Sequence, residues 1–227
     1  MEDRSLSIGL MVPENNTTME PELLAWLPEG SSCRRLGIPR GKAMLSPETL
    51  PEYLAEAVKL AQKFRDEEID LVVYGCTAAG FLGGPARDAE VASELGKITR
   101  KRVVTTASAM NAALREIGAR RIALITPYLD AVNEQLKTFL DPEIAIEVLS
   151  SFRAETVDEL AAITPEQIAK RAREVVKDQP GVDAVFIACS QLPTRAIIPE
   201  LERDLGVPVW SSIRATAWQA TRVAEVA

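Results

Sequence analysis

Histidine is absent from all 227 residues of this chain. Without an imidazole, the protein cannot build a Ser-His-Asp or Cys-His catalytic group, and it cannot bind zinc through histidine. Any proton transfer must therefore use a cysteine, carboxylate, lysine or tyrosine side chain.

Cysteine is scarce as well. The three cysteines, Cys33, Cys76 and Cys189, lie far apart and form no CxxC pair. Structural disulfides and thiolate metal clusters are therefore not expected, and we predict no metal site. We assign no role to Cys33.

Positive charge is in deficit, because 26 lysines and arginines face 33 aspartates and glutamates, for a formal net charge of −7. A nucleic acid or an anionic membrane is thus not expected as a partner, whereas a small acid held by local donors is compatible with this charge. The N-terminal apolar run is too short for a secretory signal or a membrane span, so we expect a cytoplasmic protein.

Two buried strands carry the clearest functional pattern. The apolar run at 71–74 predicts a strand that ends just before Cys76 and Thr77. A second strand is expected at 183–188, and Cys189 and Ser190 follow it, 113 positions (189 minus 76) after the first pair. Each buried strand therefore ends at a thiol followed by a hydroxyl.

Strand and helix patterns alternate along the whole chain. The expected strands cover 7–12, 33–38 within an irregular loop at 28–47, 71–74, 102–106, 121–126, 144–149, 183–188 and 207–211. The expected helices cover 19–26, 46–64, 88–99 after a glycine-rich turn at 80–85, 108–118, 129–140, 165–177, 197–205 and 215–226. This alternation predicts parallel sheets of the α/β class.

The pattern restarts near the middle of the chain. A strand closed by Pro13 is matched by one closed by Pro127, at nearly the offset between the two cysteines. We therefore expect two similar α/β halves built by internal duplication, residues 1–112 with the C-terminal helix 213–227, and residues 113–212. Ligands of parallel sheets bind beyond the carboxyl ends of the strands, so Cys76 and Cys189 would approach one ligand from opposite sides.

Two facing thiols can move protons without a cofactor. A thiol at the first turn of a helix is near the amide dipoles, and we expect its pKa to fall from about 8.5 toward neutrality. One thiolate and one thiol can then racemise a carbon, or isomerise a double bond by addition, rotation and elimination. Thr77, Ser190 and Tyr128 are suitably placed to donate to an enediolate, and the glycines at 80–84 could let backbone approach a carboxylate.

Each of these residues also has a purely structural interpretation. A lone cysteine at a strand end is usually a core residue, but duplication at matched positions favours a functional site. Tyr128 could equally be a packing residue, and Asn16 is more simply a helix cap than a ligand contact.

Four segments, at 12–22 (VPENNTTMEPE), 74–81 (YGCTAAGF), 119–136 (ARRIALITPYLDAVNEQL) and 188–212 (ACSQLPTRAIIPELERDLGVPVWSS), resemble the aspartate/glutamate racemase superfamily, in the branch of maleate cis-trans isomerase and arylmalonate decarboxylase. The resemblance implies two pseudo-symmetric Rossmann-like halves, each a parallel four-stranded sheet flanked by helices, with the active site between them. It also implies cofactor-independent chemistry on a small carboxylate. The superfamily often forms homo-oligomers, although no stretch of this chain specifies an interface.

The resemblance to maleate isomerases implies specific roles. Cys76 would attack the double bond, Cys189 would donate and recover the proton, and Asn16 and Tyr128 would hold a carboxylate. The substrate-binding residues implied are Pro13, Asn16, Thr77, Ala78, Tyr128, Ser190 and Gln191.

Some positions depart from the family patterns. The decarboxylase has a glycine in the place of Cys76 and glycines in the places of Ser190 and Gln191, so the two thiols argue against decarboxylation. A substrate-binding asparagine usual in maleate isomerases is missing at 156–158, and 212–214 lacks an amide found in relatives, so the substrate can differ from maleate.

We therefore expect an isomerase or racemase that acts on a small dicarboxylic acid through two cysteines. The alternatives are an arylmalonate-type decarboxylase, a racemase of aspartate, glutamate or a hydantoin, and a two-lobed protein that binds a small acid without chemistry.

Overall fold

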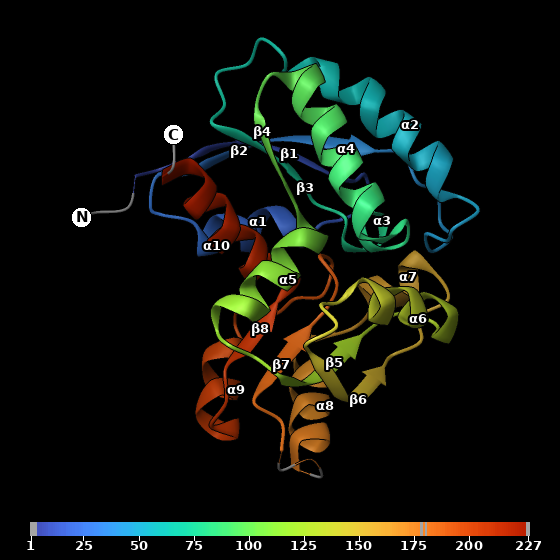
Figure 1. Ribbon diagram of the computed structural model, residues 1–227, viewed down its shortest axis with the longest axis vertical. Helices are drawn as coiled ribbons and strands as arrows, with labels where there is room; N and C mark the ends of the chain where they lie inside the picture. The colour runs from blue at the N-terminus through green and yellow to red at the C-terminus, as the bar shows by residue number, and fades with distance from the viewer. Residues whose placement is uncertain (1–3, 178, 180, 226–227) are drawn as a thin grey trace.

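The computed structural model describes residues 4–177, 179 and 181–225, and it contains two parallel four-stranded sheets flanked by helices (Figure 1). The predicted fold class is confirmed. The strand order is β2-β1-β3-β4 in one sheet and β6-β5-β7-β8 in the other. The same order recurs with every strand number raised by four, as a duplicated half requires.

The first half supplies the upper sheet in Figure 1. Its elements are β1 (Ser7–Pro13), α1 (Met19–Trp26), β2 (Ser32–Ile38), α2 (Leu50–Ala61), a 3₁₀ turn (Gln62–Phe64), β3 (Leu71–Tyr74), α3 (Thr77–Phe81), α4 (Gly84–Thr99), β4 (Arg102–Thr105) and α5 (Thr106–Glu116). All four residues of β3 are buried, as expected for a central parallel strand that is covered on both faces.

The second half repeats this arrangement below it. Its elements are β5 (Arg121–Thr126), α6 (Asp130–Phe139), β6 (Ala145–Ser151), α7 (Val157–Ala161), α8 (Pro165–Lys177), β7 (Ala184–Ile187), α9 (Ile198–Leu205), β8 (Val209–Ser211) and α10 (Ser212–Glu225). The buried strand β7 pairs with both β5 and β8, and it therefore holds the same central place as β3.

Helix α10 follows the last strand of the second half but packs on α5 and α1 (Figure 1). The division into residues 1–112 with 213–227, and residues 113–212, stays a prediction. Val226, expected in this last helix, lies outside the described residues. Among the described helices, none has the length and apolar character needed to span a membrane.

Three local expectations were wrong. The turn expected at 80–85 is confined to Leu82 and Gly83, because α3 runs through Gly80 to Phe81 and α4 begins at Gly84. A Cβ on Gly80 would clash with the Cβ of Ala107, so glycine is needed there for close packing between α3 and α5. The helix expected from residue 46 begins at Leu50, and the five-residue helix α7 was not expected at all.

Candidate active site

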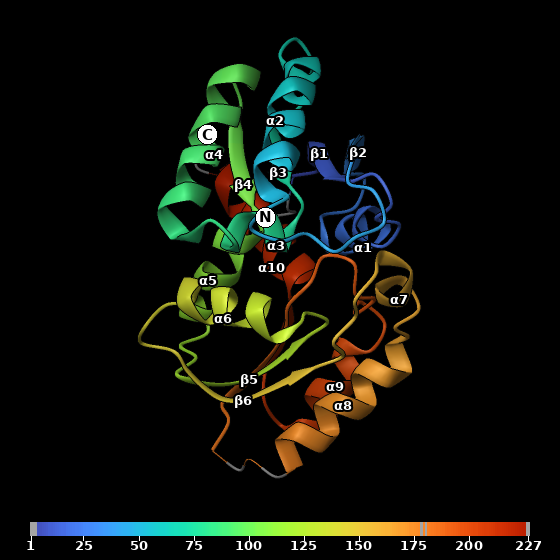
Figure 2. The same cartoon turned by 90° about the vertical axis from the view of Figure 1, so that its right-hand side faces the viewer.

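A cavity of about 230 Å³ lies between the two halves. In Figure 2, α3 of the first half sits directly above α6 of the second, and these two helices are in contact. Cys76 and Cys189 follow the carboxyl ends of the central strands β3 and β7, and both line the cavity. All nine residues predicted for the site line it, namely Pro13, Asn16, Cys76, Thr77, Ala78, Tyr128, Cys189, Ser190 and Gln191. Their individual roles stay predictions.

The loops after the two strands hold the thiols in similar ways. Cys76 has an extended backbone at the start of α3, and the amides of Ala78 and Ala79 face its sulfur. The amide of Gln191 donates to the sulfur of Cys189 at 3.4 Å. The exposed fractions of Cys76 and Cys189 are only 4% and 6%, so bulk water has little access to either thiol.

The expected fall of the thiol pKa toward neutrality was wrong. Burial raises the pKa of both Cys76 and Cys189 above the ordinary value of 9.0, because a thiolate loses its hydration in the cavity. The Arg40 guanidinium lowers the pKa of both thiols in part, as do the nearby amides. The hydroxyl of Tyr53 also lowers the pKa of Cys76, and the hydroxyl of Tyr128 lowers the pKa of Cys189. Desolvation outweighs the sum of these effects.

Two hydrogen bonds from Ser190 to the loop around Cys76 join the halves. The amide of Ser190 donates to the Thr77 hydroxyl at 3.1 Å, and the Ser190 hydroxyl donates to the carbonyl of Gly75 at 2.8 Å. Thr77 therefore faces the opposite thiol loop directly, and its hydroxyl proton is still available to a ligand.

Asn16 is both a helix cap and a bridge between the halves. Its side-chain oxygen accepts from the amides of Thr18 and Met19 at 3.0 Å each. Its amide nitrogen donates to the carbonyl of Ser190 at 3.1 Å. Asn16 therefore caps α1 and joins the halves, and its contact with a carboxylate stays a prediction.

Two other predicted residues have unused donors. The Tyr128 hydroxyl and the Gln191 side-chain nitrogen are buried and have no hydrogen-bond partner among the described residues. The ring of Tyr128 is fixed by an edge contact with Phe81, with the centroids 5.3 Å apart, and Asn133 donates to its carbonyl at 2.9 Å. These two side chains are therefore poised to donate to an acceptor-rich ligand.

Sequence reasoning missed the other wall of the cavity. Most of this wall is apolar, and three of its residues are polar or charged, namely Arg40, Ser46 and Glu155. The apolar residues are Ala43, Met44, Leu45, Leu129, Val132, Ala154 and Leu160. Arg40 lies in the segment expected to be an irregular loop, and no motif pointed to it. The glycines at 80–84, proposed to approach a carboxylate, are not part of the described cavity lining.

The loop that carries Arg40 crosses to the second half. Ala43 forms an antiparallel bridge with Thr156, and the amide of Val157 donates to the carbonyl of Lys42 at 3.1 Å. The positions at 156–158, where an asparagine was expected, therefore hold this loop and do not line the cavity. Among the described residues, no group of three or more cysteine, aspartate or glutamate side chains could bind a metal ion.

The sequence matches the family model for arylmalonate decarboxylase over residues 8–227. The maleate isomerase of Nocardia farcinica (strain IFM 10152) is 31% identical over 226 residues, which cover 95% of this chain and 88% of that protein. The arylmalonate decarboxylase of Bordetella bronchiseptica is 30% identical over 185 residues, which cover 81% of this chain and 77% of that protein.

The fold is also similar to that of a solved maleate cis-trans isomerase from Nocardia farcinica. That structure is a cysteine-to-serine variant with a covalently bound succinylcysteine intermediate. It superimposes with a TM-score of 0.88 at 26% identity, covering 98% of this chain and 94% of the other.

Proposed function

This chain belongs to the arylmalonate decarboxylase family, and on that premise we propose that it is a cofactor-independent isomerase of a small cis-unsaturated dicarboxylate, with maleate as the reference substrate. One observation carries the proposal: two buried thiols, one from each half, line the same cavity. A single thiol would be enough for protonating a carbanion, whereas addition and elimination across a double bond need a nucleophile and a proton donor together.

The reaction begins with Cys76 as a thiolate. Its sulfur forms a bond to one carbon of the double bond, and the π electrons move to the neighbouring carbon and its carboxylate as an enediolate. Cys189 then gives its thiol proton to that carbon, leaving a succinyl group on Cys76. Rotation about the new single bond follows. Cys189 takes a proton back, the carbon–sulfur bond breaks, and the trans double bond forms, which leaves Cys76 a thiolate and Cys189 a thiol as at the start.

The surroundings of the thiols fit these steps. The amides of Ala78 and Ala79 stabilise the Cys76 thiolate before attack and after elimination. Burial keeps Cys189 protonated, as a proton donor must be. The Tyr128 hydroxyl and the Gln191 amide nitrogen can donate to the enediolate. The succinylcysteine in the Nocardia farcinica variant is the adduct that this scheme requires, and it supports the scheme.

Decarboxylation of a substituted malonate is the second candidate. The family model and the Bordetella bronchiseptica relative favour it, and the apolar wall of the cavity could receive an aryl or alkyl group. In this reaction Cys189 alone would protonate the enediolate left by loss of CO2, and Cys76 would be dispensable. A cytoplasmic location and a homo-oligomeric assembly stay predictions from the sequence.

Proton NMR in D2O with separate additions of maleate, phenylmalonate, a hydantoin and the enantiomers of aspartate and glutamate tests the proposal. We expect fumarate from maleate. Replacing either Cys76 or Cys189 by alanine should abolish the reaction, whereas Cys33→Ala, on β2 outside the cavity lining, should leave it unchanged. Phenylacetate formation that survives Cys76→Gly would favour the decarboxylase, and deuterium exchange at an α-carbon would favour a racemase.

A further inference from the structure

Arg40 is a half-buried arginine that lines the cavity and carries two buried donor atoms without a partner among the described residues. Its Nε and Nη2 atoms are shielded from solvent, and no described residue accepts a hydrogen bond from either. Its side chain forms no ion pair with any described carboxylate. Burying charged donors without hydrogen-bond acceptors costs free energy, because the donors lose their hydration. We therefore expect an anion to bind to Nε and Nη2 of Arg40.

The two free atoms lie on one edge of the guanidinium. Nε–H and one Nη2–H point in parallel directions, which is the geometry that binds both oxygens of a carboxylate at once. Arg40 also lines a second pocket with Glu52 and Glu56, but neither of these carboxylates forms an ion pair with it. In the described lining of the cavity between the halves, the other charged residue is Glu155, which is exposed and whose amide donates to the Glu159 carboxylate.

The charge of Arg40 also reaches the reacting groups. It lowers the pKa of Cys76 and of Cys189, which come from opposite halves and line the same cavity as Arg40. The remaining unpartnered polar atoms of the described lining, on Tyr128 and Gln191, are a hydroxyl and an amide nitrogen from the second half. One carboxylate can therefore meet Arg40 while a second meets Tyr128 and Gln191.

We propose that Arg40 is the residue that selects a dianionic substrate, by binding one carboxylate through its Nε and Nη2 edge while the other end of the substrate lies against Tyr128 and Gln191. This inference rests on the proposed function for the identity of the reaction, but it concerns binding alone. Arg40, on the loop before α2, would then donate to the carboxylate in place of the asparagine that is missing at 156–158.

Labelling of the thiols by two reagents tests the proposal without any substrate. Iodoacetate and iodoacetamide both form a carbon–sulfur bond with a thiolate and release iodide, but only iodoacetate carries a carboxylate. The ratio of their rates at Cys76 and Cys189, read by mass spectrometry, cancels any change in thiol reactivity. In Arg40→Gln, we expect this ratio to fall about 10-fold or more relative to the wild type.

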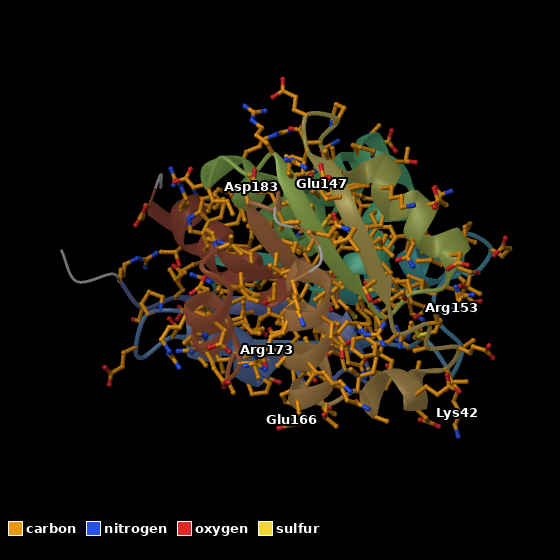
Figure 3. All side chains as sticks on the ribbon, turned by 90° about the horizontal axis from the view of Figure 1, so that it is seen from below. Lys42, Glu147, Arg153, Glu166, Arg173 and Asp183 are labelled. Carbon is orange, nitrogen blue, oxygen red and sulfur yellow. The ribbon has the colours of Figure 1, made fainter. Side chains whose placement is uncertain are left out.

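Lys42→Gln is the matched control, because it removes the same charge from the same loop. The Lys42 side chain is exposed, points away from the molecule in Figure 3, and is not part of the cavity lining. Its rate ratio should equal that of the wild type. Arg40→Lys keeps the charge but loses the two parallel N–H donors, so its rate ratio should lie between those of the wild type and Arg40→Gln.

Calorimetry with succinate and succinamate supplies the second arm, since neither compound has a double bond and they differ by one charge. We expect the wild type to prefer succinate, and Arg40→Gln to lose about 10- to 100-fold in succinate affinity with little change for succinamate. An equal loss for both compounds would indicate a merely structural role and would overturn the proposal, as would an unchanged rate ratio. If the protein prefers succinate in an Arg40-dependent way but does not isomerise maleate, the proposed reaction is overturned and the binding role of Arg40 stands.

Discussion

The amide of Ser190 donates a hydrogen bond to the hydroxyl of Thr77 at 3.1 Å, although 113 positions separate the two residues. Each of them directly follows one of the two cavity cysteines, so this bond fixes the two thiol loops relative to each other. Thr77→Val keeps the shape of the side chain but leaves the Ser190 amide buried without an acceptor. We expect a loss of about 1–3 kcal/mol in the free energy of unfolding, measured by urea denaturation.

Thr77→Ser is the control for this prediction. It retains the hydroxyl and loses one methyl group, so it should lose clearly less stability than the valine variant and should retain more activity. Equal stability of Thr77→Val and the wild type would mean that the bond contributes nothing to holding the halves together.

Removing the Tyr128 hydroxyl should separate activity from stability. In the free protein this hydroxyl lies beside the Cys189 thiol but has no geometrically sound hydrogen bond to any described residue, so Tyr128→Phe removes a buried polar group at little structural cost. We expect the free energy of unfolding to stay the same or to rise slightly, while kcat/KM for maleate falls by about 10-fold or more. A variant that loses stability and activity together would show instead that the hydroxyl has a structural partner.

The activity should rise with pH through the neutral range. The reaction needs the Cys76 thiolate, and burial raises the pKa of this thiol above 9.0, so the reactive fraction increases by about tenfold for each pH unit below that value. The raised pKa of Cys189 keeps the proton donor in its acid form over the same range. Because Arg40 lowers both values, Arg40→Gln should move the rising limb of the kcat/KM profile to higher pH.

A profile that levels off near neutral pH in the wild type would contradict this prediction, since it would mean that the thiolate is stabilised far more than burial allows. Rates of alkylation by iodoacetamide across the same pH range provide an independent measure, because they report on the thiolates without any substrate.

Much of the fold could be predicted because its signals are local. The helices over Met19–Trp26 and Pro165–Lys177 and the strand Arg121–Thr126 have the bounds that apolar periodicity and the flanking prolines indicated. The glycine-rich segment at 80–85 misled the prediction in part, because Gly80 serves close packing between helices and only Leu82 and Gly83 form a turn. The reason for a glycine at position 80 is the contact with Ala107 on α5, and Ala107 lies far from Gly80 in the sequence.

The site divides in the same way. The thiols and hydroxyls could be predicted because duplication repeats them at matched strand ends, where parallel sheets present their residues. Arg40 could not, because it lies in a loop without periodicity and acquires its meaning only from the cavity that it enters. The raised thiol pKa also escaped prediction, since burial of the loops depends on the packing of both halves.

Asp88 on α4 carries a buried carboxyl that should make stability depend on pH. Its exposed fraction is 4%, Thr105 donates to one of its oxygens at 2.6 Å, and the other oxygen has no partner among the described residues. Burial raises its pKa from 3.8 to about 6. Between these two values the folded state holds a proton that the unfolded state has released, so the free energy of unfolding falls as pH rises through this window, by up to about 3 kcal/mol.

Asp88→Asn is neutral at every pH and keeps an oxygen for Thr105, so it should lack this contribution. We expect the difference in unfolding free energy between the variant and the wild type to grow in favour of the variant from pH 4 to about pH 6.5, and to change little above it. Urea denaturation at several pH values measures this difference, with Asp66→Asn, a change at an exposed carboxyl, as the control. Parallel curves for the wild type and Asp88→Asn would mean that Asp88 titrates as it does in the unfolded chain. In that case, burial of Asp88 would not cost its carboxylate the hydration that it has in the unfolded chain.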